Sequence, residues 1–197
     1  MILSGGEIEA LCRKAARGGG MPWGLAEESG RAVRWLEARG LAGADALVEV
    51  LGRARPRPPR NEGSVWMADC PIFLGATLTD RASEIAPRGA DIRVLMGAIL
   101  LLPALARIAR HQSLMLAWPG GRGFLGRREV WLDGEVPEGL IRARPGNLRS
   151  GVKLLRVPPR ALPQGALEAL TALAQRTYAP AHLGQDGGAG AGRTDND

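Results

Sequence analysis

Apolar residues recur every three to four positions through the first fifty residues, which is the spacing of amphipathic helices. Ser4 and Glu7 have the spacing of a capping box, so a first helix is predicted to begin there and to end at the glycines 18–20. The same spacing predicts a second helix from Pro22 to Gly40 and a third through Leu47–Leu51. These three helices are expected to form a helical cap.

The pattern is less regular in the middle of the chain. Arg53–Gly63 is rich in arginine and proline and is predicted to be an extended linker. Ser64–Ala86 fits either a buried strand or a short helix, and Ile92–Leu102 leaves the same two alternatives open. Pro103 is expected to begin another helix.

Beyond residue 113 the hydrophobic period changes to two, which is typical of strands. Turn-forming Gly, Pro, Asp and Asn residues separate four short candidate strands: Leu114–Trp118, Val130–Leu132, Leu140–Ala143 and Val152–Val157. Short turns between neighbouring strands favour an antiparallel sheet. A final helix is predicted from Pro163 to Thr177.

A helix-rich first half and an antiparallel second half predict an α+β fold. We expect three parts: a helical cap over residues 1–54, an α+β body over 64–183 and a Gly-rich tail over 184–197. With 197 residues and 45% hydrophobic side chains, the chain is long enough and apolar enough for a true core.

The positive charge of the chain is concentrated in one region. The net charge is +6, and residues 101–160 hold eleven basic and four acidic side chains, a surplus of seven. A basic surplus is compatible with nucleic-acid binding, but aromatic residues make up only 4% of the chain and are not interleaved with the arginines. An anionic ligand or a solvated basic face therefore ranks above a nucleic-acid partner.

The two cysteines, Cys12 and Cys70, are far apart and belong to no CxxC motif, so neither a disulfide scaffold nor a zinc site is indicated. Cys12 falls on the apolar face of the first helix. The chain opens without a signal-peptide pattern, and its most apolar run, 94–106, is too short to span a bilayer. These features favour a cytoplasmic protein without a membrane partner.

A Gly-Arg segment is the first candidate site. Gly121–Gly126 matches GxGxxG, but a dinucleotide fingerprint requires a helix after the glycines, and here another strand is predicted. Backbone amides beside cationic side chains can still hold a phosphate or a carboxylate. The candidate anion-binding residues are Gly121, Arg122, Gly123, Arg127, Arg128 and Lys153; the alternative is a mobile hairpin loop.

Lys153 is of interest because the chain contains only two lysines against 24 arginines. Together with Ser150 it has SxxK spacing, yet in a strand residues three apart face opposite sides, so a serine–lysine nucleophile is not favoured. The two histidines, His111 and His182, form no metal-ligand pattern, and no metal site is predicted. No motif identifies a cofactor.

The C-terminal tail is the second candidate site. Asp195, Asn196 and Asp197 place two side-chain carboxylates, an amide and a terminal carboxylate together after a glycine-rich stretch. Such oxygen-rich groups could dock on the basic segment near the Gly-Arg residues. The alternative is a disordered, solubilising end.

Two blocks of sequence resemble a known family. The blocks are Glu9–Gly18 with Trp23–Gly40, and Arg176–Pro180 with the glycine-rich stretch and Thr194–Asp197. They resemble a bacterial family known only as a domain of unknown function. The resemblance runs from near one end of the chain to the other, and it implies no activity. It makes an ordered tail as well supported as a disordered one.

Two functions therefore stay open. The first is a cytoplasmic accessory or ligand-binding component that serves a metabolic enzyme, with a protein or a small anionic ligand as its partner. The second is an enzyme acting on a small anionic substrate where the Gly-Arg segment, Lys153 and the tail converge. A deep pocket lined by polar side chains would favour the second function, and a broad exposed apolar patch would favour the first.

Overall fold

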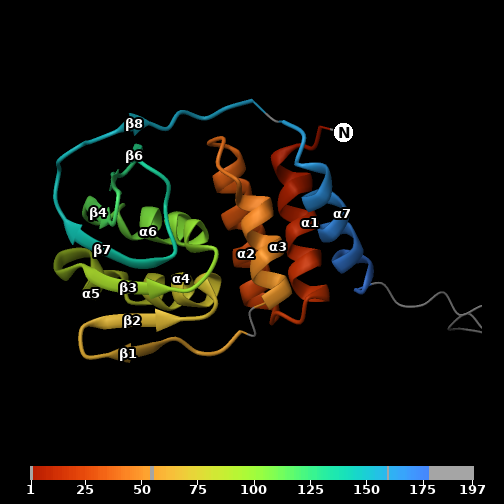
Figure 1. Ribbon diagram of the computed structural model, residues 1–197, viewed down its shortest axis with the longest axis horizontal. Helices are drawn as coiled ribbons and strands as arrows, with labels where there is room; N and C mark the ends of the chain where they lie inside the picture. Colours follow the sequence, from red (N-terminus) through yellow and green to blue (C-terminus); the bar gives the residue numbers. More distant parts are fainter. Residues whose placement is uncertain (1, 54–55, 159, 178–197) are drawn as a thin grey trace, which may run out of the picture.

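The computed structural model describes residues 2–53, 56–158 and 160–177. These residues form the α+β fold that the sequence predicts (Figure 1). A large, mostly antiparallel sheet carries helices on one face, and a bundle of helices lies beside it.

The helical bundle contains the three N-terminal helices and the last described helix of the chain. Its members are α1 (Gly5–Gly18), α2 (Trp23–Glu37), α3 (Gly43–Arg53) and α7 (Gln164–Gln175). The predicted capping box is present at α1: the Glu7 amide donates to Ser4 Oγ, and the Ser4 amide donates to Glu7 Oε2 at 2.7 Å.

Two glycines allow the helices of the bundle to approach closely. A Cβ atom on Gly30 of α2 would lie 2.5 Å from the carbonyl oxygen of Glu9 on α1. A Cβ atom on Gly18 would collide with the carbonyl of Leu173 on α7. The last described helix therefore packs directly on the first one, as Figure 1 shows.

The sheet has eight strands among the described residues, in the order β1-β2-β3-β7-β4-β5-β6-β8. Only β2 and β3 run parallel, and every other neighbouring pair is antiparallel. The strands are β1 (Arg60–Glu62), β2 (Val65–Ala68), β3 (Ala90–Val94), β4 (Leu114–Trp118), β5 (Gly121–Leu125), β6 (Val130–Asp133), β7 (Gly139–Pro145) and β8 (Val152–Lys153).

The two segments that the sequence left ambiguous both contain helix. The helical elements in this part of the chain are α4 (Pro71–Asp80), α5 (Ala82–Arg88), the 3₁₀ turn η1 (Ala98–Leu101) and α6 (Leu102–Ile108). Residues 64–86 thus contain a strand followed by helix, with Pro71 in the first turn of α4. Residues 92–102 divide in the same way at Gly97, whose φ of 59° only glycine adopts readily.

Three of the four strands predicted after residue 113 are confirmed, and the fourth is shorter than expected because only Val152 and Lys153 pair with β6. The predicted linker also contains β1, which pairs with β2. The glycine-rich segment from residue 121 is strand β5 and not a loop. Its glycines have no side chains that could alternate between apolar and polar, so the hydrophobic pattern could not indicate a strand.

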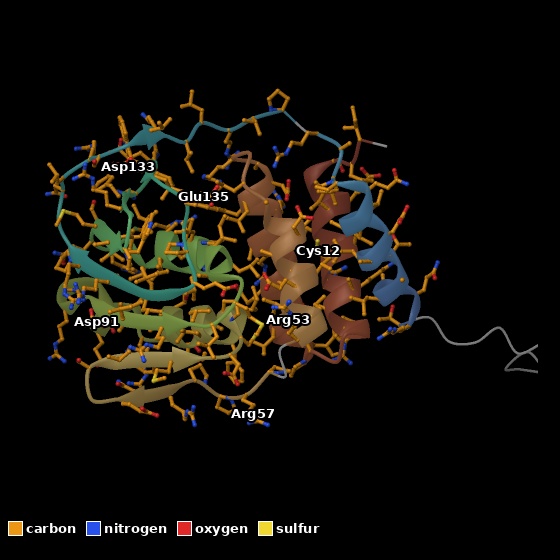
Figure 2. All side chains as sticks on the ribbon, in the orientation of Figure 1. Cys12, Arg53, Arg57, Asp91, Asp133 and Glu135 are labelled. Atoms are coloured by element: carbon orange, nitrogen blue, oxygen red, sulfur yellow. The ribbon has the colours of Figure 1, made fainter. Side chains whose placement is uncertain are left out.

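One continuous hydrophobic core joins the bundle to the sheet. It includes Cys12 of α1, Leu36 of α2 and Ile141 of β7, none of which is exposed. Figure 2 places Cys12 among the helices of the bundle, as its position on the apolar face of α1 predicts. The bundle is therefore held against the sheet, and the two enclose a cavity at their junction.

Candidate anion-binding site

A cavity of about 650 Å³ lies between the bundle and the edge of the sheet. Its walls come from α2, α4, α6, the β5–β6 turn (residues 126–129) and the strap (residues 154–158), which leaves β8 in the direction of α7. Cavities of roughly 300–1,000 Å³ hold small-molecule ligands in other proteins. The cavity is therefore the first place to look for function.

Helix α2 presents a polar stripe to the cavity. Glu28, Arg31 and Trp35 of α2, and Arg39 just after the helix ends at Glu37, are spaced three to four residues apart and line the same wall. The Arg39 guanidinium lies 3.8 Å from the centroid of the Trp35 ring and donates to the Trp35 carbonyl at 3.0 Å. This stacking holds a planar cation at the wall.

Arg107 of α6, and Arg110 just after the helix ends at Ile108, lie opposite α2. Glu28 bridges the two helices, since its carboxylate lies 2.6 Å from Arg107 Nη2 and 2.9 Å from Arg31 Nη1. Burial works against ionisation of Glu28, but the hydrogen bond and charge of Arg107, together with Arg31, outweigh it and lower the pKa of the carboxyl. Glu28 is therefore ionised at neutral pH.

Arg107 also has an unused donor. Its Nε atom is buried and finds no hydrogen-bond partner among the described residues. A buried donor without an acceptor is destabilising, and a ligand that supplied an acceptor would remove that cost.

The wall on the sheet side is also basic. Arg127, Arg128 and Glu129 come from the β5–β6 turn, Lys153 comes from β8, and Arg156 comes from the strap. The backbone fixes both segments, because the Gly126 amide donates to the Glu129 carbonyl and the Leu154 amide donates to the Val130 carbonyl, each at 2.8 Å.

Glu129 is held by its neighbours on this wall. Its carboxylate accepts from Arg149 at 2.5–2.8 Å and from Trp131 Nε1 at 3.2 Å, and lies 4.0 Å from Lys153 Nζ. The hydrogen bonds from Arg149 and Trp131 are the main reason that the pKa of Glu129 is lowered. This carboxylate is also ionised and paired at neutral pH.

Among the described lining residues, eight side chains are cationic and two are acidic. Both acidic groups are already engaged in ion pairs. Five arginines form no ion pair with any described residue: Arg39, Arg110, Arg127, Arg128 and Arg156. Burial and the nearby positive charge of Arg156 lower the pKa of Arg39, although its guanidinium remains protonated. The cavity therefore carries uncompensated positive charge.

Residues 3–82 match one known family. The family is described as a protein of unknown function (DUF3726). The predicted resemblance to a domain of unknown function is thus confirmed over this stretch, which includes the α2 and α4 walls of the cavity. The walls from α6, the β5–β6 turn and the strap lie outside it. No curated protein matches the sequence significantly.

The structure brings three of the six predicted anion-binding residues together. Arg127, Arg128 and Lys153 line the cavity. Gly121, Arg122 and Gly123 are not among its lining residues: they lie on β5. Arg127, Arg128 and Lys153 therefore share one site, whereas two glycines of the GxGxxG pattern, Gly121 and Gly123, lie away from it and the third, Gly126, lines the cavity.

The glycines of β5 have a packing role instead. A Cβ atom on Gly121 would collide with the Trp118 indole, and one on Gly123 would lie 3.4 Å from the same ring and 2.9 Å from Leu132. The strand thus makes room for a large aromatic side chain that is only 6% exposed. The first two glycines of the GxGxxG pattern therefore fit close packing within the sheet.

Arg122 points to a different partner. Its Nε atom lies 3.2 Å from Asp133 Oδ2 across the β5–β6 pair. Figure 2 shows Asp133 over the sheet, on the side of the view away from the bundle. Asp195, Asn196 and Asp197, the predicted tail site, lie outside the described residues.

Sequence analysis missed four arginines of the cavity: two on the helices α2 and α6, Arg31 and Arg107, and two just after these helices, Arg39 and Arg110. Arg31 and Arg39 are eight residues apart, and Arg107 and Arg110 are three apart, a spacing that would place each pair on one side of a helix. That spacing was the available signal, but it is equally typical of a solvated helix face.

Other site types find less support in the described part of the chain. None of the helices there is long and apolar enough to cross a membrane. The residues described also contain no group of three or more His, Cys, Asp or Glu side chains placed to hold a metal ion. Ser150 does not line the cavity, although Lys153 does.

Proposed function

We propose that this protein is a ligand-binding protein whose cavity takes a small, multiply charged anion. The observation that carries the proposal is the charge of the lining: eight cations face two carboxylates, and both carboxylates are held by arginines. Guanidinium groups bind phosphates and carboxylates through paired hydrogen bonds. A cleft with low-dielectric walls also strengthens the field that its charges produce.

An enzyme that acts on an anionic substrate would also need a polar pocket, and this cavity is one. The state of Glu28 and Glu129 supports binding over proton transfer. Both have lowered pKa values and are ionised at neutral pH, whereas a general acid or base works best with a pKa near the working pH. These carboxylates are suited to holding the arginines in position.

Binding of pyrophosphate and of citrate, measured by isothermal titration calorimetry, tests the proposal. The variant is Arg127→Ser/Arg128→Ser, since both side chains are exposed and form no described ion pair, so that folding is preserved. Charge-assisted hydrogen bonds contribute about 1.5–3 kcal/mol each, and exposure reduces this value, so we expect a loss of roughly 10- to 100-fold in affinity.

Arg88→Ser/Arg142→Ser is the matched control, because it removes the same charge at two exposed positions that do not line the cavity. The control should bind like the wild type. An equal loss in both double variants would show a nonspecific charge effect. Absence of binding to either anion at millimolar concentration would also contradict the proposal.

An accessory role with a protein partner is supported by a separate observation. Large apolar side chains are exposed along the segment that carries β8 and the strap: Leu148, Val152, Leu155 and Val157. Exposed apolar groups in one segment are typical of an interaction surface. A Leu148→Ser/Leu155→Ser variant should lose proteins that co-purify with the wild type, and an unchanged set would contradict this role.

The cysteines support a cytoplasmic location. Cys12 and Cys70 are free and buried, as expected in a reducing compartment. Subcellular fractionation tests this proposal, and recovery of the protein in a secreted fraction would contradict it.

A further inference from the structure

The floor of the cavity differs chemically from its rim. It is formed by small or apolar side chains of α4 and α6, among them Ile72, Gly75, Ala76 and Ala104. A Cβ atom on Gly75 would lie 2.9 Å from the Cβ of Ala104, so the two helices are in close contact below the cavity. The charged side chains come from α2 and α6, from the residues just after these two helices, from the β5–β6 turn, and from β8 and the strap.

A ligand that reaches the floor must be apolar at that point. The floor side chains, Ile72, Gly75, Ala76 and Ala104, offer no hydrogen-bond donor or acceptor. A polar ligand group placed there would lose its water without gaining a hydrogen bond, which is unfavourable. An apolar group would instead gain from leaving water.

The volume supports the same conclusion. The cavity measures about 650 Å³, whereas a site for a bare phosphate needs only a few times the roughly 30 Å³ that a water molecule occupies. An inorganic anion would leave most of the space above the floor unfilled. A molecule with both a charged group and a carbon skeleton uses both parts of the cavity.

Arg107 lies at the boundary between the two parts. It follows Pro103 and Ala104 of the floor by one turn of α6, and it reaches Glu28 of the rim at 2.6 Å. Its buried Nε atom has no described partner. An acceptor atom at the junction of the charged and apolar parts of a ligand would satisfy that donor.

We infer that the ligand is an amphiphilic phosphate or carboxylate, with its anionic group among the rim arginines and an acyl or aryl portion on the α4–α6 floor. The inference rests on the proposed function and specifies the chemistry of the same site.

A series of n-alkyl phosphates from methyl to hexyl phosphate tests the inference by calorimetry. Affinity should rise with chain length by up to about fourfold for each methylene group that becomes buried on the floor. Ala76→Leu places a larger side chain on the half-buried α4 side of the floor. It should weaken hexyl phosphate at least tenfold and leave methyl phosphate within about twofold of the wild type.

Ala172→Leu is the matched control, because it makes the same change on the exposed side of α7, outside the cavity. It should reproduce the wild-type series. If Ala76→Leu lowers the melting temperature sharply, Ala106→Leu on α6 makes the same test from the facing helix. Equal affinity for all chain lengths, or an equal loss for methyl and hexyl phosphate in the floor variants, would overturn the inference.

Failure of the inference can be told apart from failure of the proposed function. If all chain lengths bind equally and Arg127→Ser/Arg128→Ser weakens each of them, the anion site stands and the apolar subsite does not. If no alkyl phosphate binds, and pyrophosphate and citrate also fail, both proposals are wrong. Affinity that rises with chain length, is lost in the floor variants and is retained in Ala172→Leu supports both.

Discussion

Replacing Glu28 with Gln should have opposite effects on stability and on ligand affinity. Glu28 is the acidic group that joins α2 to α6, through Arg31 at 2.9 Å and Arg107 at 2.6 Å. The substitution keeps the shape of the side chain and removes its charge. The folded protein loses two ion pairs, while the cavity becomes more positive.

The loss of stability can be estimated from the exposure of the partners. Hydrogen bonds to charged groups contribute about 1.5–3 kcal/mol each when they are shielded from water. The side chains of Arg31 and Arg107 are 53% and 35% exposed, so solvent screens both pairs. We therefore expect the free energy of unfolding to fall by about 1–2 kcal/mol at pH 7.

The gain in affinity follows from Coulomb's law. A negative charge removed about 7 Å from a bound anion changes its energy by roughly 0.6–2.4 kcal/mol per ligand charge, for effective dielectric constants of about 80 to 20. Pyrophosphate should therefore bind at least about threefold more tightly to Glu28→Gln than to the wild type. The increase should diminish at high salt, which screens these charges.

The pH dependence gives a second check. Because the native pKa of Glu28 is lowered, its contribution is complete above the ordinary value of 4.5 and is lost as the pH falls through the native pKa. Urea unfolding should therefore show a clear difference between wild type and Glu28→Gln at pH 7 and a smaller one near pH 3.

Glu27→Gln is the control for this experiment. Glu27 also pairs with Arg31, at 3.2 Å, but it is 46% exposed and does not line the cavity. It should change stability by no more than about 0.5 kcal/mol and leave affinity unchanged. Unaltered stability in Glu28→Gln, or weaker pyrophosphate binding, would refute this account of the site.

Three further predictions concern the core and the tail. Leu36→Ala should lower the free energy of unfolding, measured in urea, by about 2–5 kcal/mol because Leu36 is fully buried. Leu11→Ala should lower it by less because Leu11 is half-buried, and equal values for the two variants would contradict this packing. Burial, with a smaller effect of Glu37, raises the pKa of Cys12 to about 12, so a thiol reagent should modify it at pH 8 only after unfolding; rapid labelling of the native protein would be inconsistent with its burial. Deletion of Thr194–Asp197 should lower the melting temperature if the acidic tail contacts the basic surface, and an unchanged melt would favour a disordered end.

The N-terminal helices could be predicted because their signals are local. Ser4 and Glu7 are three residues apart, and their capping bonds depend on nothing else in the chain. Strand β5 could not be predicted, because Gly121 and Gly123 leave room for Trp118 and for residues of β6, which approach them from the two neighbouring strands. A contact of this kind leaves no period in the sequence.

Only part of the candidate site could be predicted from the sequence, for the same reason. Arg127, Arg128 and Lys153 were noticed because they lie beside a glycine-rich motif in a basic segment. Arg39 and Arg107 are 68 positions apart in the sequence, and both line the cavity only because α2 packs against α6. The spacing of residues along one helix does not show which other helix that face will contact.

The contact of α7 with α1 constrains how the chain can fold during synthesis. Gly18 at the end of α1 packs against Leu173, and 145 residues separate the last residue of α1 from the first residue of α7. At about 5–20 residues per second, a ribosome needs roughly 7–30 s to make that stretch. During this time the side of α1 that α7 later covers lacks its partner. Helix α1 is therefore completed only after α7 has been made, and its apolar side is the surface that a chaperone would have reason to protect.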